Sequence, residues 1–240
     1  KGNRSRIKLI NERWGHRAIA SISPHEVGAY LQEVMNKRSV ATRNRYLAVL
    51  RKVFAYAAEN ALVSVDPTAS FKQLKEPSKR IEALTPKQFG QLMNVLPPYA
   101  QIIMGILHDT GMRAGELHNL RWRHIRSEDR QIVVENAKNN ELRLIPMSNY
   151  VYDTFEELRQ GLEFKQAHKG HVQATIFWPD DSDIDAVVIP PIDIKKSLAT
   201  AAAKIGLPKI TRHMMRHTFA TYLGSKEVTD MDLMDLGGWK

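Results

Sequence analysis

The 240-residue chain contains no cysteine and no long apolar run. Without cysteine, a disulfide framework, a thiolate zinc site, an iron–sulfur cluster and a cysteine nucleophile are all excluded. The longest apolar stretch, residues 99–107, is far shorter than the roughly 18 residues that a membrane-spanning helix needs. Residues 1–8 are not followed by the apolar segment of a signal peptide. These absences predict a soluble intracellular protein.

Both ends of the sequence lack the usual signs of a terminus. The chain begins at Lys1 instead of a methionine and stops at Lys240, directly after Trp239. No turn or capping residue closes the last element. We therefore expect the sequence to be a fragment at both ends.

Positive charge is concentrated in the first third of the chain. The whole sequence has 35 Lys and Arg against 26 Asp and Glu, a formal net charge of +9. Up to Glu82 there are 16 basic and 7 acidic residues, whereas the remainder has 19 of each. Such asymmetry predicts a polyanionic partner, most simply nucleic acid. A merely solubilising basic surface remains the alternative.

The first 68 residues are predicted to form a helical domain. Residues 24–35 and 39–62 repeat apolar side chains every three to four positions, with Ser23 as one cap and Ser39 or Thr42 as the other. Polar residues 69–82 lack this periodicity and are predicted to be a linker. The polar face of the longer helix carries the basic residues Arg43, Arg45, Arg51 and Lys52.

Residues 83–240 are predicted to form a second domain that is mostly helical with a small sheet. Helical patterns cover residues 85–95, 99–110 and 194–205. Strands at 131–134 and 142–145 flank a turn that suits a hairpin with Lys138 at its tip, and a third strand is predicted at 175–178. The fold class is therefore mainly α with a small antiparallel β-sheet.

Four short segments contain residues suited to phosphate chemistry. Arg113 lies between two glycines at the start of a helix, where a backbone can approach an anion closely. Lys138 lies on the hairpin, the segment RHMMRH contains His213 and Arg216, and LGGW ends in Trp239. Guanidinium forks can bind the oxygens of a phosphodiester in pairs and do not lose their protons at neutral pH.

In their order and spacing these segments resemble the tyrosine recombinase family, the phage-type integrases. The stretches HDTGMRAGELHNLRW and ITRHMMRHTFATYL carry the resemblance most strongly. It implies a helical, SAM-like core-binding domain before residue 69 and an α+β catalytic domain after residue 82. The catalytic residues that match the family's motif are Arg113, Lys138, His213, Arg216 and Trp239, with Glu116 orienting a guanidinium.

The resemblance also implies a role for each of these residues. Lys138 would protonate the departing 5′ oxygen, His213 would assist the nucleophile, and Trp239 would donate its indole N–H to the phosphate. The family's nucleophilic tyrosine follows the position of Trp239 by two to three helical turns, so we expect it beyond Lys240. Tyr222 is a poor substitute, because it lies in the same predicted helix as Arg216. The 240 residues should therefore bind DNA without cleaving it.

The function implied is site-specific DNA recombination through a 3′-phosphotyrosine, as in the integration and excision of phages and mobile elements. The implied partners are double-stranded DNA, a homo-tetramer on paired sites and accessory DNA-bending proteins, in the cytoplasm and at the nucleoid of a bacterial host. No cofactor, metal or membrane is implied. The alternatives are a type IB topoisomerase, a non-catalytic DNA-binding protein and a metal-dependent transposase.

Two patterns resemble metal sites but lack required ligands. His213 and His217 have the spacing of a helical zinc pair, yet Met214 stands where the glutamate of such a motif would be. The acidic residues of 180–185 resemble a calcium loop, but Ala186 and Ile192 replace its glycine and its bidentate glutamate. We expect neither pattern to bind metal.

Overall fold

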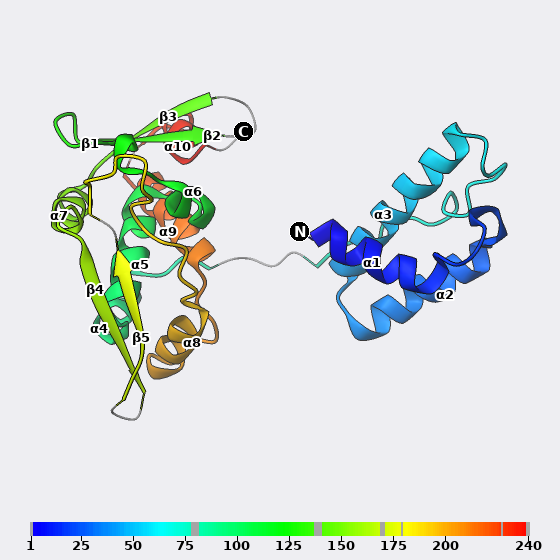
Figure 1. Cartoon of the computed structure of the whole chain (residues 1–240), viewed down its shortest axis with the longest axis horizontal. Coiled ribbons are helices and arrows are strands. Elements are labelled where there is room, and N and C mark those ends of the chain that lie inside the picture. The colour runs from blue at the N-terminus through cyan, green and yellow to red at the C-terminus, as the bar shows by residue number, and fades with distance from the viewer. Residues whose placement is uncertain are drawn as a thin grey trace. The chain divides into compact units, whose positions relative to one another are not determined.

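The computed structural model describes residues 2–77, 82–136, 141–168, 171–178, 180–226 and 228–238. The chain divides into two compact units, Lys1–Lys79 and Arg80–Lys240, which are drawn in Figure 1. Helices predominate, and the strands form small antiparallel sheets. This is the fold class that the sequence predicts.

The described part of the first unit contains three α-helices, and the second and third begin at the predicted caps. The side chain of Ser23 accepts a hydrogen bond from the Glu26 amide, and Glu26 reaches back to the Ser23 amide in a capping box. Ser39 accepts from the amide of Thr42, so Ser39 is the cap of the longest helix. The helices are α1 (Gly2–Trp14), α2 (Pro24–Lys37) and α3 (Val40–Glu59), with a short 3-10 helix at Ile19–Ser21.

Aromatic rings hold the three helices together. Trp14 meets the ring of Tyr30 edge-on at 5.1 Å between centroids, and Tyr30 meets Tyr46 at 5.8 Å. Burial raises the pKa of Tyr30 to about 12. Helix α1, which sequence periodicity did not predict, is anchored at its last residue, Trp14, which is 5% exposed. Its apolar residues Ile7 and Leu9 remain exposed.

The first half of the predicted linker is bound to α3. Asn44 is buried, donates to the carbonyl of Leu74 at 2.8 Å and to the carboxylate of Glu76 at 3.0 Å, and accepts from the Leu74 amide at 3.0 Å. The guanidinium of Arg43 donates to the Lys72 carbonyl at 2.7 Å. Residues up to Glu76 therefore belong to the first unit, because polar side chains of α3 satisfy their backbone groups.

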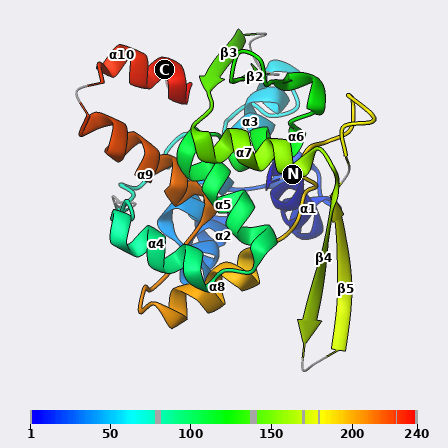
Figure 2. The same cartoon turned by 90° about the vertical axis from the view of Figure 1, so that its left-hand side faces the viewer.

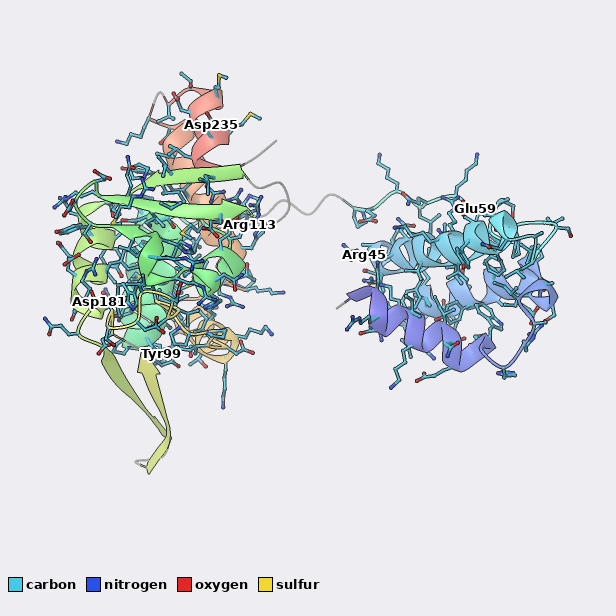
Figure 3. All side chains as sticks on the ribbon, turned by 45° about the horizontal axis from the view of Figure 1, so that its top comes forward. Arg45, Glu59, Tyr99, Arg113, Asp181 and Asp235 are labelled. Carbon is cyan, nitrogen blue, oxygen red and sulfur yellow. The ribbon has the colours of Figure 1, made fainter. Side chains whose placement is uncertain are left out.

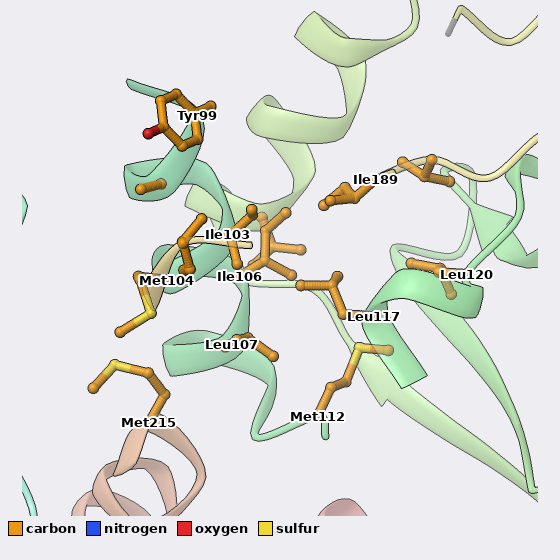
Figure 4. Packing of buried hydrophobic residues seen from close by; sticks show 14 of the residues in the cluster. Tyr99, Ile103, Met104, Ile106, Leu107, Met112, Leu117, Leu120, Ile189 and Met215 are labelled. Atoms are coloured by element: carbon orange, nitrogen blue, oxygen red, sulfur yellow. The ribbon is translucent and has the colours of Figure 1, made fainter. Parts of the chain in front are cut away.

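Helix α5 (Pro98–Thr110) forms the centre of the second unit. It runs beside α9 (Arg212–Gly224) and α7 (Asn149–Leu158), as Figure 2 shows. Its side chains at Ile103, Ile106 and Leu107 are fully buried in the main core (Figure 4). Helix α4 begins with a capping box between Thr85 and Gln88, as the Thr-Pro start predicts. The helices are α4 (Pro86–Val95), α5 (Pro98–Thr110), α6 (Ala114–Asn119), α7 (Asn149–Leu158), α8 (Lys195–Lys204), α9 (Arg212–Gly224) and α10 (Asp230–Gly237), with a 3-10 helix at Trp122–His124.

A three-stranded antiparallel sheet covers one end of this unit. It has the order β1 (Ile125–Arg126), β2 (Gln131–Asn136), β3 (Glu141–Pro146), and Figure 1 shows α10 next to it. In the β2–β3 register Ile132 faces Ile145, and both are buried. The predicted hairpin is confirmed, while its tip with Lys138 lies outside the described residues.

The predicted third strand belongs to a different sheet. Residues 175–178 fall within β5 (His171–Trp178), which pairs with β4 (Leu162–His168). These two strands form a hairpin that extends away from the helices (Figure 1). The prediction missed β4 because the sequence LEFKQAH has few apolar residues and no β-branched ones. The predicted strand is therefore confirmed, and it pairs with β4 in a second, two-stranded sheet.

The aspartates of residues 180–185 take part in local turns and in an ion pair. Asp180 and Asp183 accept hydrogen bonds from the amides of Ser182 and Asp185, as in ordinary turns. The Asp181 carboxylate binds Arg159 at 2.5 Å. Within the described ranges, no three His, Asp or Glu residues are grouped in a way that could hold a metal ion.

The helices in these ranges are too short or too polar to span a bilayer.

Candidate active site

Arg113 lies at the N-terminus of α6, where its neighbour Glu116 holds it. The Arg113 amide donates to Oε2 of Glu116 at 2.8 Å, and its Nη1 donates to Oε1 at 2.6 Å. The same carboxylate thus caps the helix and orients the guanidinium. The Arg113 side chain is 47% exposed, so it can reach a ligand in solution. Figure 3 labels it.

Gly111 gives this segment its shape. It ends α5 in the left-handed conformation, with φ of 61°, and a Cβ atom there would collide with the ring of Phe219 in α9. The carbonyl of Gly111 accepts a hydrogen bond from Nη1 of Arg216 at 2.7 Å. The turn before Arg113 is therefore in direct contact with α9.

Arg216 is almost completely buried in this contact. Its residue exposure is 3%, and burial, followed by the positive charge of Arg113, lowers the pKa of Arg216 to about 10. Glu116 raises this pKa, and Arg143 lowers it further. Arg216 remains protonated at neutral pH, but its charge is poorly solvated, which favours the approach of an anion.

Glu116 connects the arginines. Its Oε2 also accepts from Nη2 of Arg143 at 3.0 Å, and its side chain is 16% exposed. Burial raises the pKa of Glu116, but hydrogen bonds from Arg113 and the charge and hydrogen bond of Arg143 outweigh it, so the pKa lies below its ordinary value. Glu116 is therefore an anion shared between two guanidinium groups.

Arg143 is a residue of this site that the sequence analysis did not identify. It lies in β3 opposite Val134, and its side chain is 12% exposed. Its neighbours Leu142 and Leu144 are 69% and 47% exposed, whereas Ile145 is buried. Arg143 and Ile145 therefore share the inward face of the strand. The sequence does contain a pattern that could have identified Arg143. In the predicted strand it alternates with Leu142 and Leu144 and shares a face with the apolar Ile145.

The turn that follows α10 completes the cluster. Gly238 has φ of 61°, and its carbonyl accepts from Nη2 of Arg113 at 3.2 Å. A Cβ atom at Gly238 would collide with Nη1 of Arg143. The predicted site residue Trp239 directly follows this glycine in the sequence, and both Trp239 and Lys138 lie outside the described residues.

His213 lies one helical turn before Arg216 on α9 and is exposed. Its ring contacts that of His217 edge-on, at 4.8 Å between centroids. Burial, then the charges of His213 and Arg216, lower the pKa of His217. Tyr222, near the end of α9, is 50% exposed, and the ammonium of Lys226 lies 5.6 Å from the centroid of its ring.

The four basic residues predicted to contact DNA on α3 divide into two pairs. Arg45 and Lys52 are exposed and lie seven positions apart, on the same face of the helix. Arg43 is buried and Arg51 half-buried, and they donate to the carbonyls of Lys72 and Phe71. Arg45 and Lys52 are free to meet a ligand, whereas Arg43 and Arg51 hold the chain that follows α3.

Comparison with known proteins identifies the families to which the two parts of the chain are similar. The family described as "Phage integrase family" matches residues 82–240, and the "Phage integrase central domain" matches residues 2–74. Among curated proteins, tyrosine recombinase XerC of Anoxybacillus flavithermus is 24% identical over 220 residues, covering 88% of this chain and 72% of its own length.

Solved structures show the same fold. The Tn1549 transposon integrase in complex with circular intermediate DNA superposes with a TM-score of 0.73 at 22% identity, over 98% of this chain and 84% of that one. A lambda integrase tetramer bound to a Holliday junction also gives 0.73, at 19% identity, over 98% and 69% of the two chains. The chain belongs to the phage integrase family.

Proposed function

We propose that this protein is a site-specific DNA recombinase that cuts and rejoins DNA through a 3′-phosphotyrosine, as the integrases of phages and transposons do. The observation that supports this most directly is the convergence of Arg113 and Arg216 from segments about a hundred residues apart. They meet at the Gly111 turn and around Glu116. Two fixed guanidinium groups are what a phosphodiester under attack requires.

The charge of the cluster suits the transition state of that reaction. Displacement at phosphorus passes through a five-coordinate species in which the non-bridging oxygens gain negative charge. Arg113, Arg143 and Arg216 supply three positive charges, and Glu116 removes one. The cluster therefore has a net charge of +2. This charge stabilises the five-coordinate transition state, with its two negative charges, more than the substrate phosphodiester, with its one. Catalysis requires such stronger binding of the transition state.

The proton transfers are assigned to residues that match the motif of the family. The oxygen of a tyrosine attacks the phosphorus, forms the 3′-phosphotyrosine bond and passes its proton to His213. The bond to the 5′ oxygen breaks, and Lys138 gives that oxygen a proton. Trp239 donates its indole N–H to a phosphate oxygen. Rejoining is the reverse reaction with a new 5′ hydroxyl, so bond energy is conserved.

The partners follow from the same assignment. The protein would bind duplex DNA through Arg45 and Lys52 in the first unit and the arginine cluster in the second. It would act as a homo-tetramer on paired sites, with accessory DNA-bending proteins at some of them. We place it in the bacterial cytoplasm, at the nucleoid, where integration and excision of mobile elements take place.

The test is a covalent protein–DNA adduct formed by the full-length gene product on a nicked duplex. The adduct should form with EDTA present, because no step uses a metal. Arg113→Ala and Arg216→Ala should each lower its rate about 100- to 1000-fold, since each removes a pre-organised donor to the phosphate. Tyr222→Phe, which removes a hydroxyl on α9 outside the cluster, is the matched control and should leave the adduct unchanged.

Other results would point to other functions. Absence of an adduct, or an adduct that survives both arginine substitutions, would contradict the proposal. Loss of cleavage in EDTA would indicate a metal-dependent transposase. Relaxation of supercoiled DNA by a monomer, without paired sites, would indicate a type IB topoisomerase.

A further inference from the structure

Arg143 is a charged residue on the inward face of the sheet, where arginine side chains are seldom buried. Its side chain is 12% exposed, and its Nε is buried with no hydrogen-bond partner among the described residues. A charged group in such a place is retained only where another charge or a function requires it. The charge that Arg143 meets is the carboxylate of Glu116.

Through this contact Arg143 joins three segments that are distant in the sequence. It belongs to β3, a strand of the hairpin that carries Lys138. Its Nη2 binds the carboxylate that orients Arg113 on α6. Its Nη1 lies against Gly238, the residue that precedes Trp239, so that a Cβ atom at Gly238 would displace it. Each segment brings one of the residues to which a catalytic role is proposed above.

The carboxylate of Glu116 is bound by both arginines. Among the described residues, Oε1 accepts from Arg113, whereas Oε2 accepts from the Arg113 amide and from Arg143. If the contact to Arg143 is lost, Glu116 keeps its two hydrogen bonds from Arg113, but the pair loses its link to the sheet and the guanidinium of Arg113 can shift with the carboxylate. A displacement of about 1 Å at a reacting centre can reduce a rate about 100-fold.

We propose that Arg143 is a positioning residue for DNA cleavage. It fixes Glu116, and through Glu116 the guanidinium of Arg113. This inference rests on the proposed function, because it concerns the rate of the same reaction. In this proposal Arg143 acts through Glu116 and does not bind the phosphate itself.

The test compares adduct formation by the full-length protein and its Arg143→Met variant on the nicked duplex. Methionine keeps most of the side-chain volume and removes the charge, so the rate should fall about 30- to 100-fold. Arg143→Lys retains one contact to Glu116 and should lose less than about 10-fold, which provides a rescue if the methionine variant folds poorly. Thermal melting of each variant reports whether it is folded at the temperature of the assay.

A double substitution separates positioning from a general loss of structure. If Arg143 acts through Arg113, it has nothing left to position in Arg113→Ala. Adding Arg143→Met to that variant should then lower the rate by less than about 3-fold. If Arg143 only stabilises the fold, its substitution should reduce the rate by the same factor in both backgrounds.

Arg159 provides a matched control. It also holds carboxylates, since it binds Glu156 at 3.1 Å and Asp181 at 2.5 Å, and it lies at the end of α7 outside the cluster. Arg159→Met should lower the melting temperature and leave the adduct rate within about 2-fold of the unaltered protein, because its contacts among the described residues are to Glu156, Asp181, Ser127 and Trp122, outside the cluster.

The results distinguish this inference from the proposed function. Normal adduct formation by Arg143→Met, or an equal loss in the two backgrounds, overturns the inference and leaves the proposed function intact. Failure of the unaltered protein to form any adduct overturns the proposed function and this inference with it.

Discussion

The two glycines that flank Arg113 have different tasks. Gly111 has φ of 61° and is packed against Phe219, and its carbonyl binds Arg216. Gly115 lies in α6, and a Cβ atom there would meet nothing within 4 Å. Sequence reasoning treats both as places where the backbone approaches an anion. The structure shows that Gly111 is required by packing and conformation.

The two glycines therefore make a matched pair of substitutions. Gly111→Ala should lower the free energy of unfolding by about 2–4 kcal/mol, from the left-handed backbone and the collision with Phe219. Gly115→Ala should leave it unchanged or raise it by up to about 1 kcal/mol, because alanine favours helix. Urea unfolding of the two variants measures the difference. Equal stability of both would contradict the packing of Gly111 against α9.

Several residues of the candidate site can be predicted from the sequence, because they lie in short motifs that are rarely found by chance. Arg113, His213 and Arg216 lie in short motifs with glycine, histidine and arginine at fixed spacings, and Arg216 donates a hydrogen bond to the Gly111 turn that precedes Arg113. Arg143 lies in no such motif. Its importance arises from the register of β3, which turns it inward beside Ile145, and a register is decided by tertiary packing.

At the scale of secondary-structure elements, helices that begin with a capping residue could be predicted from the sequence. The irregular segment that follows α3 could not. Ser23, Ser39 and Thr85 cap their helices where the sequence indicates, because capping depends on three or four consecutive residues. The segment after α3 has no such signal. Its backbone groups bind Arg43, Asn44 and Arg51, which are 20 to 30 positions away in the chain.

This contact predicts a specific effect of Asn44→Ala. The substitution removes three hydrogen bonds to Leu74 and Glu76 and should destabilise the protein by about 2–3 kcal/mol. Limited trypsin digestion should cut faster after Lys72 and Lys75, because the released segment can enter the protease. Mass spectrometry of the fragments identifies the sites.

Asn60→Ala is the control for this effect. Asn60 caps the end of the same helix and donates to the Tyr56 carbonyl at 2.8 Å, but it is exposed and does not touch the segment. Its substitution should leave the two cleavage rates unchanged. If Asn44→Ala also leaves them unchanged, the segment does not depend on α3 for its order.

At the scale of the whole molecule, the net charge of +9 comes from the first third of the sequence, but only part of it is available to DNA. Arg43 and Arg51 donate hydrogen bonds to backbone carbonyl groups. Arg13 and Lys37 form ion pairs with Glu33. Composition alone counts all of these residues equally. The structure reduces the predicted DNA surface of α3 to the exposed pair Arg45 and Lys52.

This reduction predicts how DNA binding depends on salt. Each phosphate contact releases counterions and adds about 0.9 to the slope of log K against log salt. The double variant Arg45→Gln/Lys52→Gln should therefore lower the slope by about 2 in titrations of duplex DNA between about 50 and 200 mM salt. Lys37→Gln removes a charge that is already paired with Glu33 at 3.1 Å and should leave the slope unchanged. If the double variant has the slope of the unaltered protein, α3 binds no phosphate through this pair, and the contacts must come from the other basic residues.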